Sequence, residues 1–185
     1  MIRNSEATQS RLLLAAKGQF AANGYERTTV RDIAAEAGVN VALINRYFGS
    51  KEELFAQAVA IDLEFPDLSD VNKGEIGERL VRHFYTRWEG NYADDLLRVL
   101  VRTAATNATA ADKIMKILNG QIVPLVTKLT GEAGAQHRAS LVATQILGLA
   151  YCRYILNLGD DYLDPPDTVA AIAETLQRYL FAPAR

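Results

Sequence analysis

The stretch from residue 28 to residue 55, TTVRDIAAEAGVNVALINRYFGSKEELF, constrains the fold of this chain more than any other. Apolar side chains at positions i, i+3, i+4 and i+7 of a helix share one buried face. Four residues follow that spacing: Val30, Ile33, Ala34 and Ala37. Gly38 comes directly after them, and a glycine there supplies the left-handed backbone at which helices commonly end. The sequence therefore predicts a short amphipathic helix that stops at a tight turn.

A second helix is predicted over residues 41 to 47. Asn40 precedes it as a candidate N-cap, and Leu43 and Ile44 are expected to face inward. The opposite face carries groups that can meet base edges and phosphates, namely Val41, Ala42, Asn45 and Arg46. Two short helices joined by a glycine turn, the second with such a face, predict a helix-turn-helix whose second helix enters the major groove of DNA.

Capping signals flank this pair of helices. Thr29 is followed three residues later by Asp32, and Ser50 is followed three residues later by Glu53. Both pairs have the spacing of a capping box, in which the two side chains bond each other's backbone amides at a helix start. The second pair predicts a third helix that leaves the helix-turn-helix and continues to residue 65.

The candidate DNA contacts divide by chemistry. Small apolar groups suit thymine methyls, an asparagine amide suits an adenine edge, and hydroxyls or cations near a helix start suit phosphate. Arg46 fits either a guanine edge or a phosphate, and for the ring of Tyr47 core packing is an equally good interpretation. The predicted DNA-binding residues are Thr28, Thr29, Asn40, Val41, Ala42, Asn45, Arg46, Tyr47 and Lys51.

The same stretch resembles the N-terminal domain of TetR-type transcriptional regulators. The resemblance rests on TTVRDIA from residue 28, AGV from residue 37 and YFGSKEEL from residue 47, and with the preceding helix it covers about residues 8 to 55. This sequence departs from the family pattern at Ala42 and Asn45, which bears on the bases that are read. The resemblance implies phosphate contacts by Tyr47 and Lys51, and an effector pocket in the C-terminal part. It also implies that effector binding moves the third helix.

Composition and charge fit this interpretation. The 185 residues are 49% hydrophobic and 23% charged, as in ordinary soluble proteins. Residues 1 to 51 hold seven Lys and Arg against four Asp and Glu, a net charge of +3. Because the whole chain has a net charge of −2, residues 52 to 185 have a net charge of −5. A basic segment on an acidic body is typical of a DNA-contacting module joined to a second domain. With no signal peptide or membrane-length apolar run, we expect a cytoplasmic protein.

The remaining chain continues in helical patterns, which predicts an all-α fold of about nine helices. A helix-turn-helix domain (1–49) is joined by a connecting helix (50–65) to a ligand-binding and dimerisation domain (66–185) in this prediction. Pro66 and the polar DLSDVNKGE stretch mark the boundary. Periodic apolar residues predict the other helices at 8–23, 74–89, 94–105, 109–130, 135–158 and 166–181.

The helix predicted at 135–158 is apolar on all sides, so it must be buried on more than one side. Its own core can cover one side, and the helix pair of a second copy is the simplest cover for the other. The chain is therefore predicted to form a homodimer through Leu141, Gln145, Leu149, Val169, Ile172 and Leu176.

The C-terminal part also offers candidates for a pocket that binds a small apolar ligand. They are His83, Phe84, Arg87, Trp88, Arg102, Asn107, Tyr151 and Tyr154, with Tyr85 and Tyr92 as further wall candidates. A single residue of this kind is more often an ordinary core or surface side chain than a pocket wall.

Catalysis is not supported by the sequence. Cys152 lies in the most apolar segment, where a thiol is ordinarily inert packing, and it has no sequence relation to His83 or His137 that indicates a metal or nucleophile site. No cofactor motif is present. The sequence thus predicts a ligand-responsive regulator, most simply a repressor, that binds palindromic double-stranded DNA as a homodimer. The alternative is a helical small-molecule binding or interaction protein without specific DNA readout.

Overall fold

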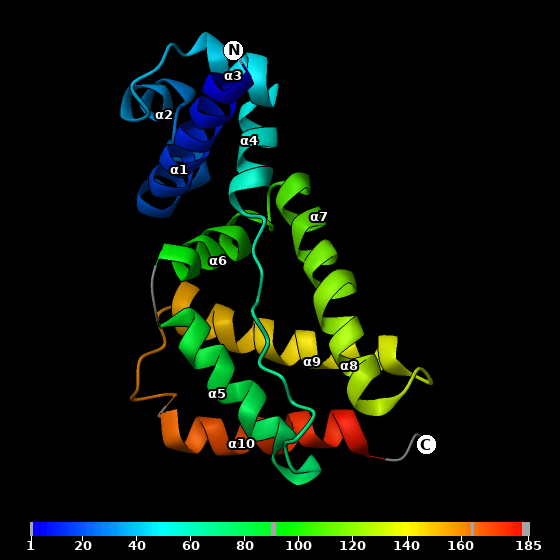
Figure 1. The fold of residues 1–185 in the computed structure, drawn as a ribbon. Helices are drawn as coiled ribbons and strands as arrows, with labels where there is room; N and C mark the ends of the chain where they lie inside the picture. Colours follow the sequence, from blue (N-terminus) through cyan, green and yellow to red (C-terminus); the bar gives the residue numbers. More distant parts are fainter. Residues whose placement is uncertain (1, 90–91, 164, 183–185) are drawn as a thin grey trace. The chain divides into compact units, whose positions relative to one another are not determined.

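The computed structural model describes residues 2–89, 92–163 and 165–182, and its contacts divide the chain into two compact units. Unit 1 comprises Met1–Ile61 and Asn91–Lys113, and unit 2 comprises Asp62–Gly90 and Ile114–Arg185. Over the described ranges all regular structure is helical, and no strand is formed (Figure 1). The predicted all-α fold class is confirmed.

Unit 1 is built around its first helix. Its helices are α1 (Ile2–Arg27), α2 (Val30–Glu36), α3 (Ala42–Phe48), α4 (Lys51–Ala58) and α6 (Tyr92–Thr103). Helix α1 packs against α2, α4 and α6. Its backbone leaves helical geometry at Gly24, which has φ 75° and ψ 174° and directly follows the predicted end of this helix at residue 23. Three rings fill the core: the ring centroid of Phe55 lies 5.0 Å from that of Phe20 and 4.8 Å from that of Tyr25.

Side-chain hydrogen bonds fix the starts of the short helices. Thr29 accepts a hydrogen bond from the Asp32 amide, and Asp32 accepts one from the Thr29 amide, so this capping box is complete. Val41, not the predicted Asn40, is the N-cap residue of α3, but Asn40 Oδ1 accepts from the amide of Ala42, the first residue of the helix, at 2.8 Å. At α4 the Ser50 hydroxyl accepts from the Glu53 amide at 3.1 Å, and the return bond to Ser50 is not formed among the described residues.

Gly38 lies in the turn with φ 65°, the left-handed conformation that its position predicted. A Cβ at this position would meet open space, so backbone strain alone decides its replacement. We expect Gly38→Val to destabilise the chain by about 2 kcal/mol, and hence to lower its melting temperature by roughly 4 to 8 °C. Asparagine tolerates positive φ better, so Gly38→Asn should lose less in the same calorimetric scan. Equal melting temperatures for the two variants would contradict this role of the turn.

The third helix is shorter than predicted. Helix α4 ends at Ala58, whereas the sequence pattern extended it to residue 65. Beyond it the chain is irregular, and side chains from unit 2 bind its backbone: Gln121 accepts from the Leu63 amide, and the His83 ring bonds the Leu63 carbonyl. These tertiary hydrogen bonds replace the helical ones. The predicted connecting helix over 50–65 is therefore wrong in its last seven residues.

Helix α6 belongs to unit 1, whereas the sequence interpretation placed residues 94–105 with the C-terminal domain. Its apolar face is buried on α1, where the side chains of Leu96, Leu97, Val99 and Leu100 are covered. An amphipathic face shows that a helix packs, but it does not specify its partner, so the pattern alone could not make this assignment.

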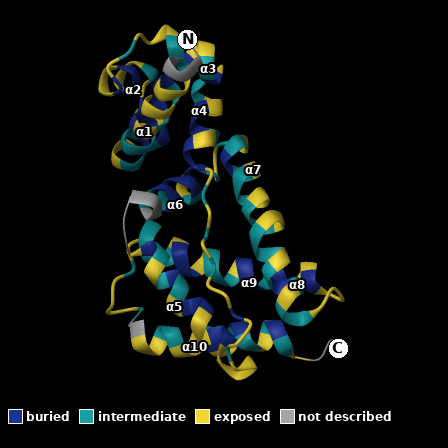
Figure 2. Ribbon diagram, in the orientation of Figure 1, coloured by how far each residue is buried: buried dark blue, intermediate teal, exposed yellow. Residues whose placement is uncertain are grey.

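Unit 2 is a group of helices whose buried side chains form one apolar core (Figure 2). After the 3-10 turn Lys73–Glu75 come α5 (Ile76–Trp88), α8 (Val123–Thr130), α9 (Ala135–Ala150) and α10 (Pro165–Phe181). Helix α10 packs on α5, and α9 packs on both α8 and α10. Its core residues are Leu68, Ile76, Leu80, Val81, Val126, Ala135, Ala139, Val142, Ala173, Leu176 and Leu180.

Two π-helical turns interrupt the long helical runs. Helix α7 (Ala108–Ile117) continues without a break through the π turn Leu118–Ile122 into α8, which begins next to Pro124. This wider turn lies directly before Val123 and Pro124, and a proline cannot supply the helical amide hydrogen bond. A second π turn, Tyr151–Ile155, extends α9. If the run over 108–130 is counted once, the described ranges contain the nine predicted helices.

Candidate functional site

Helix α3 presents a polar face to solvent. Ile44 and Phe48 are buried beneath it, whereas Ala42, Asn45 and Arg46 are exposed and Val41 is 39% exposed. Asn40 is also exposed at the start of the helix. The five residues predicted to meet bases are thus accessible together: Asn40 and Val41 directly precede α3, and Ala42, Asn45 and Arg46 lie on its exposed side.

The two threonines before α2 differ from each other. Thr29 is exposed and its hydroxyl donates to Asp32 at 2.6 Å. Thr28 is only 1% exposed, and its hydroxyl donates to the carbonyl oxygens of Gln19 and Gly24 at 3.0 and 2.7 Å. Both bonds lie near the break in α1 at Gly24, and they use the hydroxyl of the buried Thr28. The predicted phosphate contact by the Thr28 side chain is therefore wrong.

Tyr47 and Lys51 extend the basic surface beside α3. Both are partly exposed, and the Arg46 guanidinium lies 5.8 Å from the centroid of the Tyr47 ring. The Lys51 ammonium lies 4.3 Å from the centroid of the Tyr25 ring, a distance at which cation–π attraction holds it. Arg46 and Lys51 thus each lie near an aromatic ring, and both side chains remain accessible at the surface.

Tyr25 also donates a hydrogen bond to Glu52. Burial raises the pKa of the Tyr25 phenol, and its hydrogen bond to Glu52 at 2.7 Å raises that pKa further. The same hydrogen bond lowers the pKa of the Glu52 carboxyl. Tyr25 therefore stays a donor and Glu52 stays an acceptor at neutral pH, so this link between α1 and α4 does not change with pH near 7.

Unit 2 contains an apolar cavity of about 70 Å³. Four of the predicted pocket residues line it from α5: His83, Phe84, Arg87 and Trp88. The remaining lining residues are apolar. Leu80 also belongs to α5, and the others come from five further segments: Leu63, Phe65, Ile122, Leu125, Val126, Val142, Ala143, Ile146 and Leu176. Such side chains give no sequence signal that distinguishes a cavity wall from ordinary core, which is why the sequence analysis missed them.

The other predicted pocket residues lie elsewhere. Asn107 and Arg102 belong to unit 1, where Asn107 caps α7 through the amide of Ala110 at 2.9 Å and Arg102 is exposed. Tyr151 is exposed as well. Tyr154 stacks on Trp88 with ring centroids 5.2 Å apart, so it supports a cavity residue without lining the cavity itself. The two further wall candidates are Tyr85 and Tyr92. Tyr85 packs against the core of unit 2, and the side chain of Tyr92 lies outside the described residues.

Two of the predicted dimer residues are not available to a partner. Leu176 is fully buried between α10 and its own core, and Leu149 is buried as well. Leu176 belongs instead to the apolar core of unit 2, because the helical spacing of an apolar residue does not show which neighbour covers it. Leu141, Gln145, Val169 and Ile172 are partly exposed.

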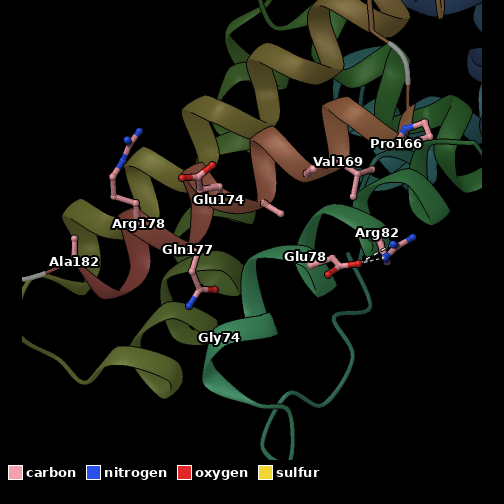
Figure 3. Close-up of a pocket in the computed structure, with 11 residues that line it drawn as sticks. Gly74, Glu78, Arg82, Pro166, Val169, Glu174, Gln177, Arg178 and Ala182 are labelled. Atoms are coloured by element: carbon pink, nitrogen blue, oxygen red, sulfur yellow. Dashed lines mark hydrogen bonds and ion pairs between the residues drawn. The ribbon is translucent and has the colours of Figure 1, made fainter.

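A larger hollow of about 590 Å³ lies open on the outer side of unit 2 between α5 and α10 (Figure 3). Its walls carry Glu78 and Arg82, which pair at 2.7 Å, opposite Glu174 and Arg178 on α10. In the described parts of the chain, no cluster of three His, Cys, Asp or Glu side chains is placed to hold a metal ion. None of the helices within those parts combines the length and hydropathy that a membrane span requires.

Comparison with protein families assigns both parts of the chain. Residues 12–58 match the family model described as "Bacterial regulatory proteins, tetR family". Residues 74–180, more than half of the chain, match "Tetracyclin repressor-like, C-terminal domain". The chain belongs to the TetR family. The predicted resemblance to TetR-type regulators is thereby confirmed.

Curated TetR relatives match through the N-terminal segment. The dual regulator CecR of Shigella flexneri is 47% identical over 55 residues, which are 30% of this chain and 24% of CecR. The repressor SCO4008 of Streptomyces coelicolor is 44% identical over 57 residues, 31% of this chain and 30% of the repressor. The matched segment thus spans less than a third of either relative.

Solved TetR-like structures match over nearly the full chain. The multidrug binding protein EbrR, solved with imidazole, has a TM-score of 0.73 at 20% identity and covers 95% of this chain and 91% of its own. NalD of Pseudomonas aeruginosa, the secondary repressor of the MexAB-OprM efflux pump, has a TM-score of 0.68 at 19% identity, covering 98% and 100%. These likenesses establish the fold of both units.

Proposed function

We propose that this TetR family member is a transcriptional repressor that binds operator DNA through α3 and releases it when a small molecule occupies the cavity of unit 2. The observation that carries the proposal is the exposed face of α3. Asn45 and Arg46 can donate to base edges or phosphates there, while Val41 and Ala42 can meet thymine methyl groups. The protein would act in the cytoplasm, where its operator is.

The relatives support the direction of regulation. SCO4008 and NalD are named repressors, and EbrR is named a multidrug binding protein. A ligand makes the repressor release DNA only if it binds the conformation that cannot bind DNA more tightly than the one that can, typically by about 1 to 3 kcal/mol. A cognate ligand that tightened operator binding would therefore contradict repressor release.

Operator binding can be tested with the DNA upstream of the chain's own coding region. We expect sequence-specific retardation in a mobility-shift titration at moderate salt, with unrelated DNA of equal length as competitor. Absence of retardation at every salt concentration would instead favour the alternative, a small-molecule binding protein without DNA readout.

We further propose that the repressor is a homodimer joined through the outer faces of α9 and α10. Leu141 and Gln145 on α9, and Val169 and Ile172 on α10, remain partly exposed there. Two recognition helices related by a dyad must enter successive major grooves, so the half-sites should lie about 34 Å apart or at a multiple of that distance.

A charge placed on α9 should separate the protomers. We expect Leu141→Glu to shift the sedimentation coefficient from that of a dimer to that of a monomer, because an unpaired carboxylate in an apolar interface is costly. Met115→Glu is the matched control, since Met115 is 51% exposed on α7. A wild-type chain that sediments as a monomer at micromolar concentration would refute the dimer.

A further inference from the structure

Residues 62–65, here called the strap, form one wall of the cavity in unit 2. Leu63 and Phe65 line the cavity from the strap. The Leu63 amide donates to Gln121 Oε1 at 2.8 Å, and the Leu63 carbonyl lies 2.8 Å from His83 Nε2. Because a carbonyl only accepts, Nε2 must carry the proton and donate it. Both backbone groups of one apolar residue are thus bound by side chains from two separate elements.

Arg87 provides the third attachment. Its guanidinium donates to the Asp62 carbonyl and to the Glu64 carboxylate, each at 3.1 Å. The side chain of Arg87 is 13% exposed, whereas that of Glu64 is 67% exposed. One anionic partner of this arginine in the cavity wall is therefore a carboxylate that lies mostly in water.

The strap backbone is strained at the residue that supplies this carboxylate. Glu64 has φ 51°, a left-handed conformation that non-glycine residues seldom adopt. A bond from its amide to Asp62 Oδ1 at 2.9 Å holds the turn. Strain of this kind persists only where the surroundings impose it, and it is relieved when the attachments are lost. The strap is thus a segment that the side chains of His83, Arg87 and Gln121 hold closed.

The cavity is too small for a ligand while the strap is closed. Its volume of about 70 Å³ is well below the roughly 300 to 1,000 Å³ that small-molecule sites usually provide. A ligand must therefore displace part of the wall. The strap is the wall segment without regular secondary structure. Its displacement returns Glu64 to water at little desolvation cost and removes Glu64 and the Asp62 carbonyl from the Arg87 guanidinium, where an anionic group of the ligand can then bind.

We propose that the effector is a small apolar monoanion whose acidic group replaces Glu64 at Arg87 while its apolar body displaces Leu63 and Phe65. This inference rests on the proposed function, because it names the ligand of the same regulator. Only Val59–Ile61 separate the end of α4 from the strap in the sequence. Release of the strap therefore frees the segment that joins the ligand-binding unit to the helix-turn-helix.

The experiment uses Trp88, the only tryptophan of the chain, which lines the cavity. Its fluorescence is titrated with sodium octanoate and with 1-octanol, which have the same apolar body with and without a charge. Because the carboxylate is ionised at neutral pH, we expect octanoate to reach half-saturation at a concentration at least tenfold lower than octanol. Equal half-saturation, or no response across hexanoate, octanoate and decanoate, would overturn the ligand class.

Two variants separate the anion from the strap. Arg87→Gln should abolish the preference for octanoate over octanol, and because both ligands meet the same protein, any general loss of stability cancels in this ratio. Glu64→Gln should lower both half-saturation concentrations by about two- to fivefold, since it removes an ion pair of the closed strap. Glu78→Gln, which removes the exposed partner of Arg82 on the same helix, should change neither.

The outcomes distinguish this inference from the proposed function. Unchanged half-saturation in Glu64→Gln would overturn strap displacement, and a preference that survives in Arg87→Gln would overturn the role of Arg87. Failure of the wild-type protein to retard its upstream DNA without any ligand would overturn the repressor function, while the fluorescence results would still decide the ligand class.

Discussion

Arg46→Ala is expected to weaken operator binding by about five- to 150-fold, as measured by mobility-shift titration of the purified protein. A well-placed arginine contact to a base or phosphate contributes about 1 to 3 kcal/mol, and Arg46 is exposed on the face of α3 that carries the other candidate contacts. The folded state should be unaffected, because the side chain is not part of the core. An unchanged melting temperature checks this.

The form of the loss identifies what Arg46 contacts. A phosphate contact predicts similar losses for all sequences and a salt slope that is shallower by about 1, whereas base readout predicts relaxed specificity at one operator position. Arg82→Ala removes the same charge from an exposed ion pair in unit 2. If Arg82→Ala weakened DNA binding as much as Arg46→Ala, the effect would reflect net charge alone, and the assignment of α3 as the reading helix would be wrong.

The helix-turn-helix was predictable because its signals are local. The Thr29 and Asp32 pair, the positive φ of Gly38 and the bond from the Ala42 amide to Asn40 each act within a few residues, and the structure forms all three. Thr28 shows where local reasoning fails. Its hydroxyl suits a phosphate by chemistry, but Thr28 is buried and its hydroxyl donates to the carbonyls of Gln19 and Gly24.

The end of α4 and the cavity were not predictable for a different reason. The chain beyond Ala58 has apolar residues at helical spacing, but its backbone is bound by His83, Arg87 and Gln121, up to 58 residues away in sequence. The cavity likewise combines side chains from several segments, most of which are ordinary core residues. Hydrophobic periodicity specifies that a face is buried but not which neighbour covers it.

Gly77 is the position where we expect a single substitution to damage unit 2 most. It lies on α5 where this helix meets α10, and a Cβ added there would lie 2.2 Å from the carbonyl oxygen of Ala173 and 3.1 Å from the amide nitrogen of Gln177. Both are backbone atoms of a helix, so neither can move aside as a flexible side chain would. The Gly77 amide also donates to Gln177 Oε1 at 3.0 Å, and separation of the helices would break this bond.

Gly77→Val should therefore destabilise the protein by about 3 kcal/mol or more, which lowers the melting temperature of a chain of this size by roughly 6 to 12 °C. Gly120→Ala is the control, because a Cβ there meets open space within a helical run, and it should leave stability unchanged or raise it slightly. A melting temperature for Gly77→Val within about 2 °C of the wild type would contradict the close approach of the two helices. Because α5 also carries His83 and Arg87, a displaced α5 should weaken the attachment of the strap, so the octanoate response of Trp88 should shift in the same variant if it remains folded.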